Sequence, residues 1–315
     1  MDLAALEIFR TVVEAGGITR AAERLHRVQS NVTTRIRQLE QSLGVELFVR
    51  DGRRMVLTPA GQTLFDYACR ILRLSEEARH AVQPAHPHGR LRIASMESTA
   101  ASRLPSVLAA YHQQWPDVEL ELVTLITSKA LEAVRRFEVD CAFVAEPLGD
   151  LDLVSRPAFA EELVIVSSTS HPPIRRPEDL ERSTLLAFET GCNYRSRLER
   201  WFGQCGRAPN RVIQIGSYHA IVTCAAAGIG VGIVPRSVLA LYRNLPQIGI
   251  HPLGDAGRVT TVLAWHPSMG SAALAALADM LADVAVDAAA DGAADGAADG
   301  AAGGPATLGA ERAAA

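Results

Sequence analysis

Apolar residues recur at helical spacing at the start of the chain. Over residues 5–13 they stand every three or four positions, at Leu6, Ile8, Phe9, Val12 and Val13. Gly16 and Gly17 follow as a helix stop, and Thr19 is the predicted N-cap of a short second helix that ends before residues 26–27. The pattern predicts two helices joined by a glycine turn.

A third helix is predicted over residues 29–42. One of its faces is apolar, with Val32, Ile36, Leu39 and then Leu43. Two short helices joined tightly, the second with an exposed polar face, are typical of a helix-turn-helix. Downstream, residues 47–50 and 55–58 flank an Asp-Gly turn, which predicts a hairpin with a basic tip, the wing of a winged helix-turn-helix.

A long helix is predicted to start at Thr58-Pro59, because proline is favoured at the first helical position. Its apolar residues form one stripe: Leu64, Tyr67, Ala68, Ile71, Leu74, Ala78 and Val82. A second copy of the same helix is the natural partner of such a stripe, so the chain is expected to self-associate. The proline-rich residues 83–89 end this helix.

Strands and helices alternate in the second half of the chain. The predicted strands are residues 91–94, 119–125, 140–144, 163–166, 185–188, 211–215 and 230–234. This alternation predicts mainly parallel sheets with right-handed crossovers, and the number of strands suggests two subdomains. Ligands of such folds bind in a crevice beyond the strand ends.

The net charge of −4 is unevenly distributed. Residues 287–315 carry five acidic residues and one arginine, a net of −4, so residues 1–286 are neutral overall. Between Arg20 and Arg54, eight arginines stand against four acidic residues, a local excess of +4. That excess suits contact with the phosphates of double-stranded DNA.

The third helix carries side chains suited to base reading. A recognition helix contacts base edges near its N-terminus, where Gln and Asn pair with adenine and Arg binds guanine or phosphate. Arginines at a wing tip suit an A·T-narrowed minor groove. The candidate DNA-binding residues are Gln29, Ser30, Asn31, Thr33, Thr34, Arg35, Arg37, Arg53 and Arg54.

Hydroxyl groups follow three of the predicted strands. The candidate effector-binding residues are Glu97, Ser98, Thr99, Thr127, Ser128, Cys192, Arg195, Ser217 and His219. Hydroxyls and free N–H groups at a helix start can bind an anion, although simple helix capping explains them as well. Opposite charges at Glu97 and Arg195 suggest an amino-acid-like inducer, with its ammonium at Glu97 and its carboxylate at Arg195. A salt-bridge or surface role of Glu97 is the alternative.

Cys192 raises a redox alternative. It follows Gly191 at a predicted helix start near Arg195 and Arg197, surroundings that lower a thiol pKa, whereas a buried thiol would be inert. The five cysteines lack C-x-x-C spacing, so we expect neither a disulfide framework nor a metal site, and no cofactor.

An α/β enzyme with an accessory DNA module is the alternative from another class. Ser217 and His219 lack a G-x-S-x-G elbow, so catalysis is not expected. The N-terminus lacks a secretory signal, and the longest apolar run, residues 220–235, contains three glycines and is shorter than the roughly 20 residues of a membrane span. A cytoplasmic location without a membrane partner is expected.

Residues 28–61, VQSNVTTRIRQLEQSLGVELFVRDGRRMVLTPAG, resemble the signature of LysR-type transcriptional regulators. The segments IASMESTAASRLP, GCNYRSRLE and GSYHAIVTCAAAGIGVGIVP resemble the LysR subgroup that includes sarcosine oxidase and cell-division regulators. The resemblance implies a periplasmic-binding-protein-like sensor whose effector cleft includes Ser98, Thr99, Thr127 and Ser128. It also implies a wing arginine in the minor groove and dimers that pair into a DNA-bending tetramer. RNA polymerase is a candidate further partner.

Taken together, these patterns predict an α+β protein. The expected divisions are 1–58 for the DNA-binding domain, 59–89 for the dimerisation helix and hinge, 90–284 for the α/β effector-binding domain and 285–315 for a tail. The tail repeats AADG with no large apolar residue before Leu308, so it is predicted to be disordered.

Overall fold

The N-terminal module is built from α1 (Leu3–Ala15), α2 (Ile18–Arg24) and α3 (Gln29–Leu43). The computed structural model describes residues 1–51, 54–81, 86–149, 152–180, 183–204, 206, 211–242 and 247–282. The prediction of Thr19 as N-cap is wrong, because α2 begins at Ile18, two residues earlier than that cap implies, and its N-cap is Gly17. Gly16 ends α1 with a left-handed φ of 65°, so two glycines make this turn without a capping side chain.

A hairpin closes the module. Strands β1 (Phe48–Asp51) and β2 (Arg54–Leu57) pair antiparallel, as the sequence predicts for the wing. Glu40 on α3 accepts the backbone N–H of Leu47 at 2.9 Å, which ties the hairpin to the third helix. The rings of Phe9 and Phe48 meet edge to face, with centroids 5.4 Å apart. The wing therefore shares the apolar core of the three helices.

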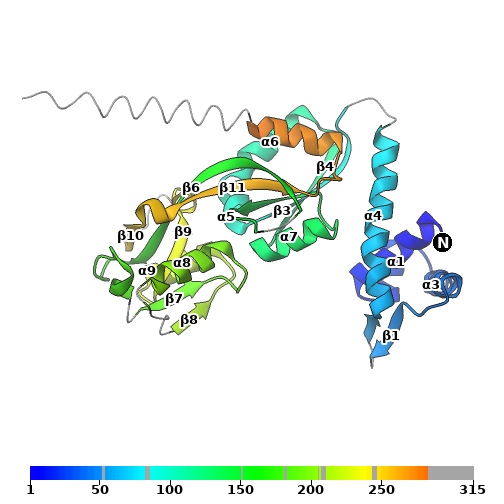
Figure 1. Ribbon diagram of the computed structural model, residues 1–315, viewed down its shortest axis with the longest axis horizontal. Coiled ribbons are helices and arrows are strands. Elements are labelled where there is room, and N and C mark those ends of the chain that lie inside the picture. The colour runs from blue at the N-terminus through cyan, green and yellow to red at the C-terminus, as the bar shows by residue number, and fades with distance from the viewer. Residues whose placement is uncertain are drawn as a thin grey trace, which may run out of the picture.

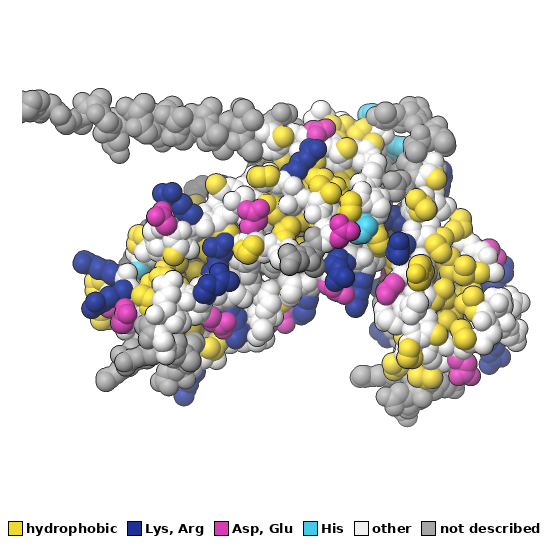
Figure 2. Space-filling view, viewed as in Figure 1, with side chains coloured by type: hydrophobic (Ala, Val, Ile, Leu, Met, Phe, Trp, Pro, Cys, Tyr) yellow, Lys and Arg dark blue, Asp and Glu magenta, His cyan; other side chains and the backbone are white. Residues whose placement is uncertain are grey.

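Helix α4 (Pro59–Ala81) joins the module to the second half of the chain (Figure 1). Its 23 residues span about 35 Å, and Thr58 Oγ1 accepts the N–H of Gly61 at its start. Ala68 from the predicted stripe is buried against the module, whereas Tyr67 and Leu74 are 54% and 66% exposed. Val82 lies outside the described residues. Figure 2 shows hydrophobic side chains gathered on the visible face of this part of the molecule.

The second half contains one twisted sheet. Its strands are β3 (Gly89–Ser95), β4 (Val118–Thr124), β5 (Cys141–Ala145), β6 (Val154–Ser168), β7 (Thr184–Ala187), β8 (Arg211–Gln214), β9 (Val231–Pro235), β10 (Ile248–Pro252) and β11 (Arg258–Trp265). Over the described residues their order is β4-β3-β5-β11-β6-β9-β7-β8, with β10 paired to β6. β3 pairs parallel with β4 and β5, and β7 pairs parallel with β8 and β9. These parallel groups form the two predicted subdomains.

Two long antiparallel strands join the subdomains (Figure 1). β11 pairs with β5 in the first subdomain, β6 pairs with β9 in the second, and β6 and β11 pair with each other. The sequence analysis predicted only the second half of β6 and missed β10 and β11. The sheet is therefore less parallel than predicted.

Helices cover both subdomains. They are α5 (Glu97–Ser102), α6 (Leu104–Gln114) and α7 (Thr127–Arg135) in the first, α8 (Asn193–Gly203), α9 (Tyr218–Ala226) and α10 (Arg236–Leu239) in the second, and a final helix at residues 272–282. Short 3-10 turns occupy Pro177–Leu180 and Gly254–Gly257. None of the helices in the described part of the chain combines the length and apolarity needed to cross a bilayer.

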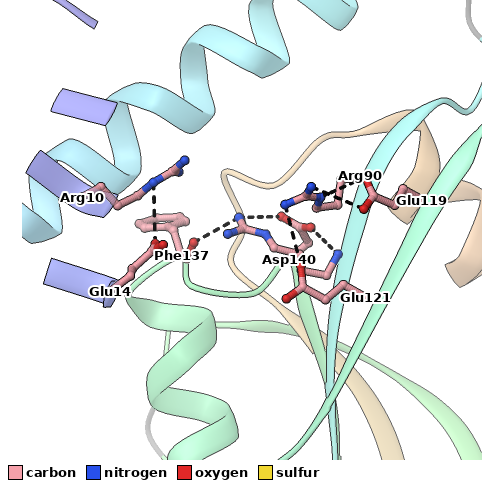
Figure 3. A network of polar contacts seen from close by, with 8 residues as sticks. Arg10, Glu14, Arg90, Glu119, Glu121, Phe137 and Asp140 are labelled. Carbon is pink, nitrogen blue, oxygen red and sulfur yellow. Dashed lines mark hydrogen bonds and ion pairs between the residues drawn. The ribbon is translucent and has the colours of Figure 1, made fainter. Parts of the chain in front are cut away.

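The linker helix contacts the sensor at the far end of α7. Phe137, with a left-handed φ of 59°, follows that helix, and its ring lies 5.9 Å from the Arg70 guanidinium and 5.0 Å from that of Arg73. Arg92 donates to the Phe137 carbonyl and pairs with Asp140, and Figure 3 shows Phe137 beside α1 of the module. α7 therefore extends from Thr127 to the surface that faces the linker helix.

Candidate functional site

The exposed face of α3 follows directly from its sequence. Val32, Ile36 and Leu39 are buried, so the residues between them must point outward. Among the predicted DNA-binding residues of this helix, Thr33 is half-buried and donates its hydroxyl to the Gln29 carbonyl at 2.9 Å, and the others are exposed. A shallow groove brings together Val28, Ser30, Asn31, Thr34, Arg35 and Gln38.

Two arginines give this face its charge. Neither Arg35 nor Arg37 has an ion-pair partner among the described residues, while Arg37 lies outside the groove. No side chain caps the start of α3, so its first N–H groups remain available to water or a phosphate. The predicted wing residue Arg53 and the side chain of Arg54 lie outside the described residues.

The subdomains enclose a cavity of about 370 Å³. It is lined by Met96, Glu97, Thr124, Leu125, Ile126, Thr127, Lys129, Phe188, Glu189, Cys192, Gln214, Gly216 and Tyr218. These residues follow the carboxyl ends of β3, β4, β7 and β8, because parallel strands meet the crevice at that edge. The aromatic rings of Phe188 and Tyr218 stack at an angle on one wall, with centroids 4.5 Å apart.

Glu97 crosses the cavity from one subdomain to the other. Its carboxylate accepts the hydroxyl of Ser217 at 3.2 Å and the backbone N–H of Tyr218 at 3.1 Å. Ser217 is the N-cap residue of α9 but makes no capping bond of its own. The carboxylate of Glu97 therefore caps α9 from across the cleft, where the helix dipole favours negative charge.

Two more contacts bridge the subdomains. Lys129 on α7 pairs with Glu189 at 2.7 Å, and both side chains are partly exposed. The N–H of Ser128 donates to the Gly191 carbonyl at 3.3 Å. Gly191 has a φ of 100°, and a Cβ at this position would collide with Ser128 Oγ. Only glycine permits such a close approach here.

Three predicted hydroxyl residues are buried. Ser98 and Thr99 are each 1% exposed at the start of α5, and Thr127 is 6% exposed at the start of α7. None of their hydroxyl oxygens has a hydrogen-bond partner among the described residues. Thr127 lines the cavity, whereas Ser98 and Thr99 are not among its lining residues.

Arg195 and His219 also lie outside the cavity lining, as do Ser128 and Ser217. Arg195 pairs with Glu199 at 2.7 Å and donates to the Phe188 carbonyl at 2.9 Å, so its charge is engaged along α8. His219 stacks on Tyr242, whose hydroxyl lies 2.7 Å from its Nδ1. The cation that lines the cavity is Lys129, which the sequence analysis did not single out.

Cys192 lines the cavity but is 6% exposed, and its Sγ lies 4.0 Å from the Tyr218 hydroxyl. Burial raises the pKa of the Cys192 thiol above its usual value, with nearby N–H groups lowering it less. Burial likewise raises the pKa of the Cys69 thiol on α4 to about 11. These environments favour the unreactive thiol form, which weighs against redox sensing.

Comparisons with known families match both halves of the chain. Residues 3–62 match the family described as bacterial regulatory helix-turn-helix protein, lysR family, and residues 84–286 match the LysR substrate binding domain. The chain belongs to the LysR family. As a LysR-type regulator it binds promoter DNA, responds to a small-molecule effector and self-associates, and it is not an enzyme.

Curated relatives support the same assignment. The HTH-type transcriptional regulator GltR of Bacillus subtilis is 40% identical over 256 residues, covering 81% of this chain and 86% of its own. The HTH-type transcriptional regulator SoxR of an Arthrobacter species is 35% identical over 264 residues, covering 83% of this chain and 90% of its own. Both alignments extend well beyond the DNA-binding module.

Solved structures share the fold. A full-length OxyR variant from Pseudomonas aeruginosa is 24% identical, with a TM-score of 0.71 over 89% of this chain and 94% of its own. Full-length CbnR in complex with its target DNA is 23% identical, with a TM-score of 0.62 over 90% of this chain and 99% of its own. The predicted winged helix-turn-helix and two-subdomain sensor are therefore confirmed as the fold.

Proposed function

We propose that this LysR-type regulator reads a pseudo-palindromic promoter site through α3 and the wing. The observation that supports this proposal is the polar face of α3, where Arg35 and Arg37 have no ion-pair partner among the described residues, opposite a buried apolar face. The proposed contacts are Gln29, Ser30, Asn31, Thr33, Thr34, Arg35, Arg37, Arg53 and Arg54. Two copies joined through α4 would present two such helices to half-sites related by a dyad.

We infer that the inducer is an amino-acid-like zwitterion. Glu97, Lys129 and Glu189 place charges of both signs around one cavity, and the rings of Phe188 and Tyr218 provide an apolar wall. Of the predicted effector residues, the inferred binding residues are Glu97, Thr127 and Ser217, with Lys129 replacing Arg195 as the cation. Each charge of a zwitterion would find an opposite charge at the wall of this cavity.

Isothermal titration calorimetry tests the ligand class. Small α-amino acids and N-methylamino acids are compared with the matching carboxylic acids and amines on the full chain. We expect only the zwitterions to bind. Glu97→Gln should lower their binding affinity about 10-fold or more, because the ligand ammonium loses an ionised partner. Equal binding of the simple carboxylic acids would reject a zwitterionic inducer.

The remaining parts of the proposal concern organisation and location. We assign residues 1–58 to DNA binding, 59–89 to dimerisation and the hinge, and 90–284 to effector binding. The cytoplasm is the proposed location, because promoter DNA is the partner there, and RNA polymerase is a candidate further partner. The predicted tail, residues 285–315, lies outside the described residues.

A further inference from the structure

We propose that the N-terminus of α9 is the carboxylate site of the sensor and that Glu97 occupies this site as an internal ligand when the cleft is empty. On this proposal an incoming carboxylate displaces Glu97, which then turns to the ammonium of the same ligand. The inference rests on the proposed amino-acid-like inducer and adds where each of its charged groups binds.

The first support is that a carboxylate already fits this site. Glu97 accepts two hydrogen bonds there, from the Ser217 hydroxyl at 3.2 Å and from the Tyr218 N–H at 3.1 Å. This pair of donors at the start of a nine-residue helix is a general arrangement for binding an anion. A ligand carboxylate would find the same donors in the same geometry.

The second support is an unused donor on the opposite wall. Thr127 is 6% exposed, lines the same cavity and has an oxygen without a hydrogen-bond partner among the described residues. Buried hydroxyls in folded proteins are almost always hydrogen-bonded, so an orphan at a cavity wall points to a missing polar ligand. Glu97 does not satisfy this hydroxyl, and on this proposal a ligand that bridges the cleft satisfies it once the Thr127 side chain turns its covered oxygen toward the cavity.

The third support is that Glu97 belongs to the other subdomain. It starts α5, whereas Ser217 and Tyr218 start α9, so the side chain spans the cleft as a ligand would. Lys129 and Glu189 form a second pair across the same cleft at 2.7 Å. The cleft thus contains two carboxylates and one ammonium of the chain itself, the same two kinds of group that a zwitterion carries.

Chemical rescue with sodium acetate tests the carboxylate site without any knowledge of the inducer. Glu97→Ala removes the internal carboxylate, so the full-length variant should melt about 2–4 °C below the wild type in sodium chloride. Sodium acetate at equal ionic strength should restore at least half of that loss. The wild type should not respond to acetate, because Glu97 fills the site at a high effective concentration.

Two matched variants locate the response. Glu97→Gln keeps one oxygen that can accept the Tyr218 N–H, and its NH2 group can donate to the Ser217 hydroxyl oxygen, so it still fills the site and should show little acetate response. Glu97→Ala combined with Ser217→Ala removes one donor and should lose most of the rescue. If the Glu97→Ala variant does not fold, Glu97→Ser takes its place in the experiment. The short serine side chain cannot reach α9, so the carboxylate site is again left open.

The outcomes separate this proposal from the proposed inducer. The carboxylate site is rejected if a folded Glu97→Ala or Glu97→Ser variant shows no rise in melting temperature in acetate. Full rescue in the double variant, or an equal rise in the wild type, also rejects it. Acetate rescue without amino-acid binding to the wild type would keep the site and reject the inducer class. Amino-acid binding without rescue would keep the inducer class and reject the site.

Discussion

The guanidinium of Arg73 on the linker helix lies 5.0 Å from the centre of the Phe137 ring on the sensor. Arg70 approaches the same ring at 5.9 Å, and the imidazole of His266 lies on it with centroids 4.7 Å apart. One aromatic side chain thus connects the helix that carries the DNA-binding module to the domain that binds the effector. Cation–π contacts of this kind contribute roughly 0.5–2 kcal/mol each.

Removing the Phe137 ring should loosen this junction. Phe137→Gly is the sharpest variant, because glycine suits the left-handed φ of 59° and only the ring contacts are lost. We expect hydrogen exchange of the α4 amides near Arg70 and Arg73 to become several-fold faster. Exchange in α3 is the internal reference and should not change. Unaltered exchange in α4 would mean that other contacts hold the helix to the sensor.

Removing Arg35 should weaken operator binding. If this side chain contacts a guanine, Arg35→Ala should cost about 1–3 kcal/mol of binding free energy and relax specificity at one base position. If it contacts a phosphate, the slope of log affinity against log salt concentration should fall by about 1. Electrophoretic or fluorescence binding assays across salt concentrations distinguish the two. Arg200→Ala, an exposed arginine of α8, loses the same charge and should leave both affinity and slope unaltered.

A charge on the exposed face of α4 should dissociate the oligomer. Leu74 is 66% exposed, so Leu74→Asp leaves the fold of one chain intact but would bury an uncompensated carboxylate between two linker helices. Light scattering should show a shift toward monomer. Leu241→Asp, at a 53% exposed position of the sensor, is the matched control. Retention of the native mass by the Leu74 variant would place the interface elsewhere.

His251 should make stability depend on pH. Its Nδ1 accepts the Ile174 N–H at 3.1 Å and its Nε2 lies 2.8 Å from Ser167 Oγ, so the folded chain holds a neutral ring. Burial lowers the pKa of His251 below its usual value, and the charge interaction with His171 lowers it further. The unfolded chain therefore binds the proton first as pH falls below about 6.5, and stability is lost toward acid.

Urea unfolding at pH 7.5 and 5.5 measures this dependence. The loss of stability between the two should be smaller in His251→Gln than in the wild type, since glutamine does not titrate. The two proteins differ at this one position, so the difference isolates His251. An equal loss of unfolding free energy in the wild type and in His251→Gln would show that groups other than His251 cause the acid sensitivity.

The sequence predicted the elements whose signals are local. Gly16 ends α1, Thr58 caps α4, and the strands on either side of the predicted Asp-Gly turn pair antiparallel. The first half of β6 was missed because Pro157 argues against a strand, but it stands where the register shifts against β11, a position that tolerates a missing N–H. Only the tertiary pairing of β6 with β11 makes this segment a strand.

The candidate effector site was also predicted only where its signals are local in the sequence. The rule that ligands meet strand ends pointed to Thr127, and applied to β7 and β8 it would also have found Glu189 and Gln214. Arg195 was proposed for its charge and its expected place on the wall opposite Glu97, although its i,i+4 partner Glu199 is visible in the sequence. The capping of α9 by Glu97 depends on how the two subdomains face each other, which no local pattern contains.

Helix α7 has one end at the effector cavity and leads at the other to Phe137 beside the linker helix. A rigid rod of about 13 Å that tilts by a few degrees moves its far end by roughly 1 Å, enough to disturb an aromatic contact. Such mechanical linkage works in both directions, because a coupling free energy is shared equally by the two sites. Operator DNA bound far from the cleft must then alter the affinity for the inducer by the same factor that the inducer alters the affinity for the operator.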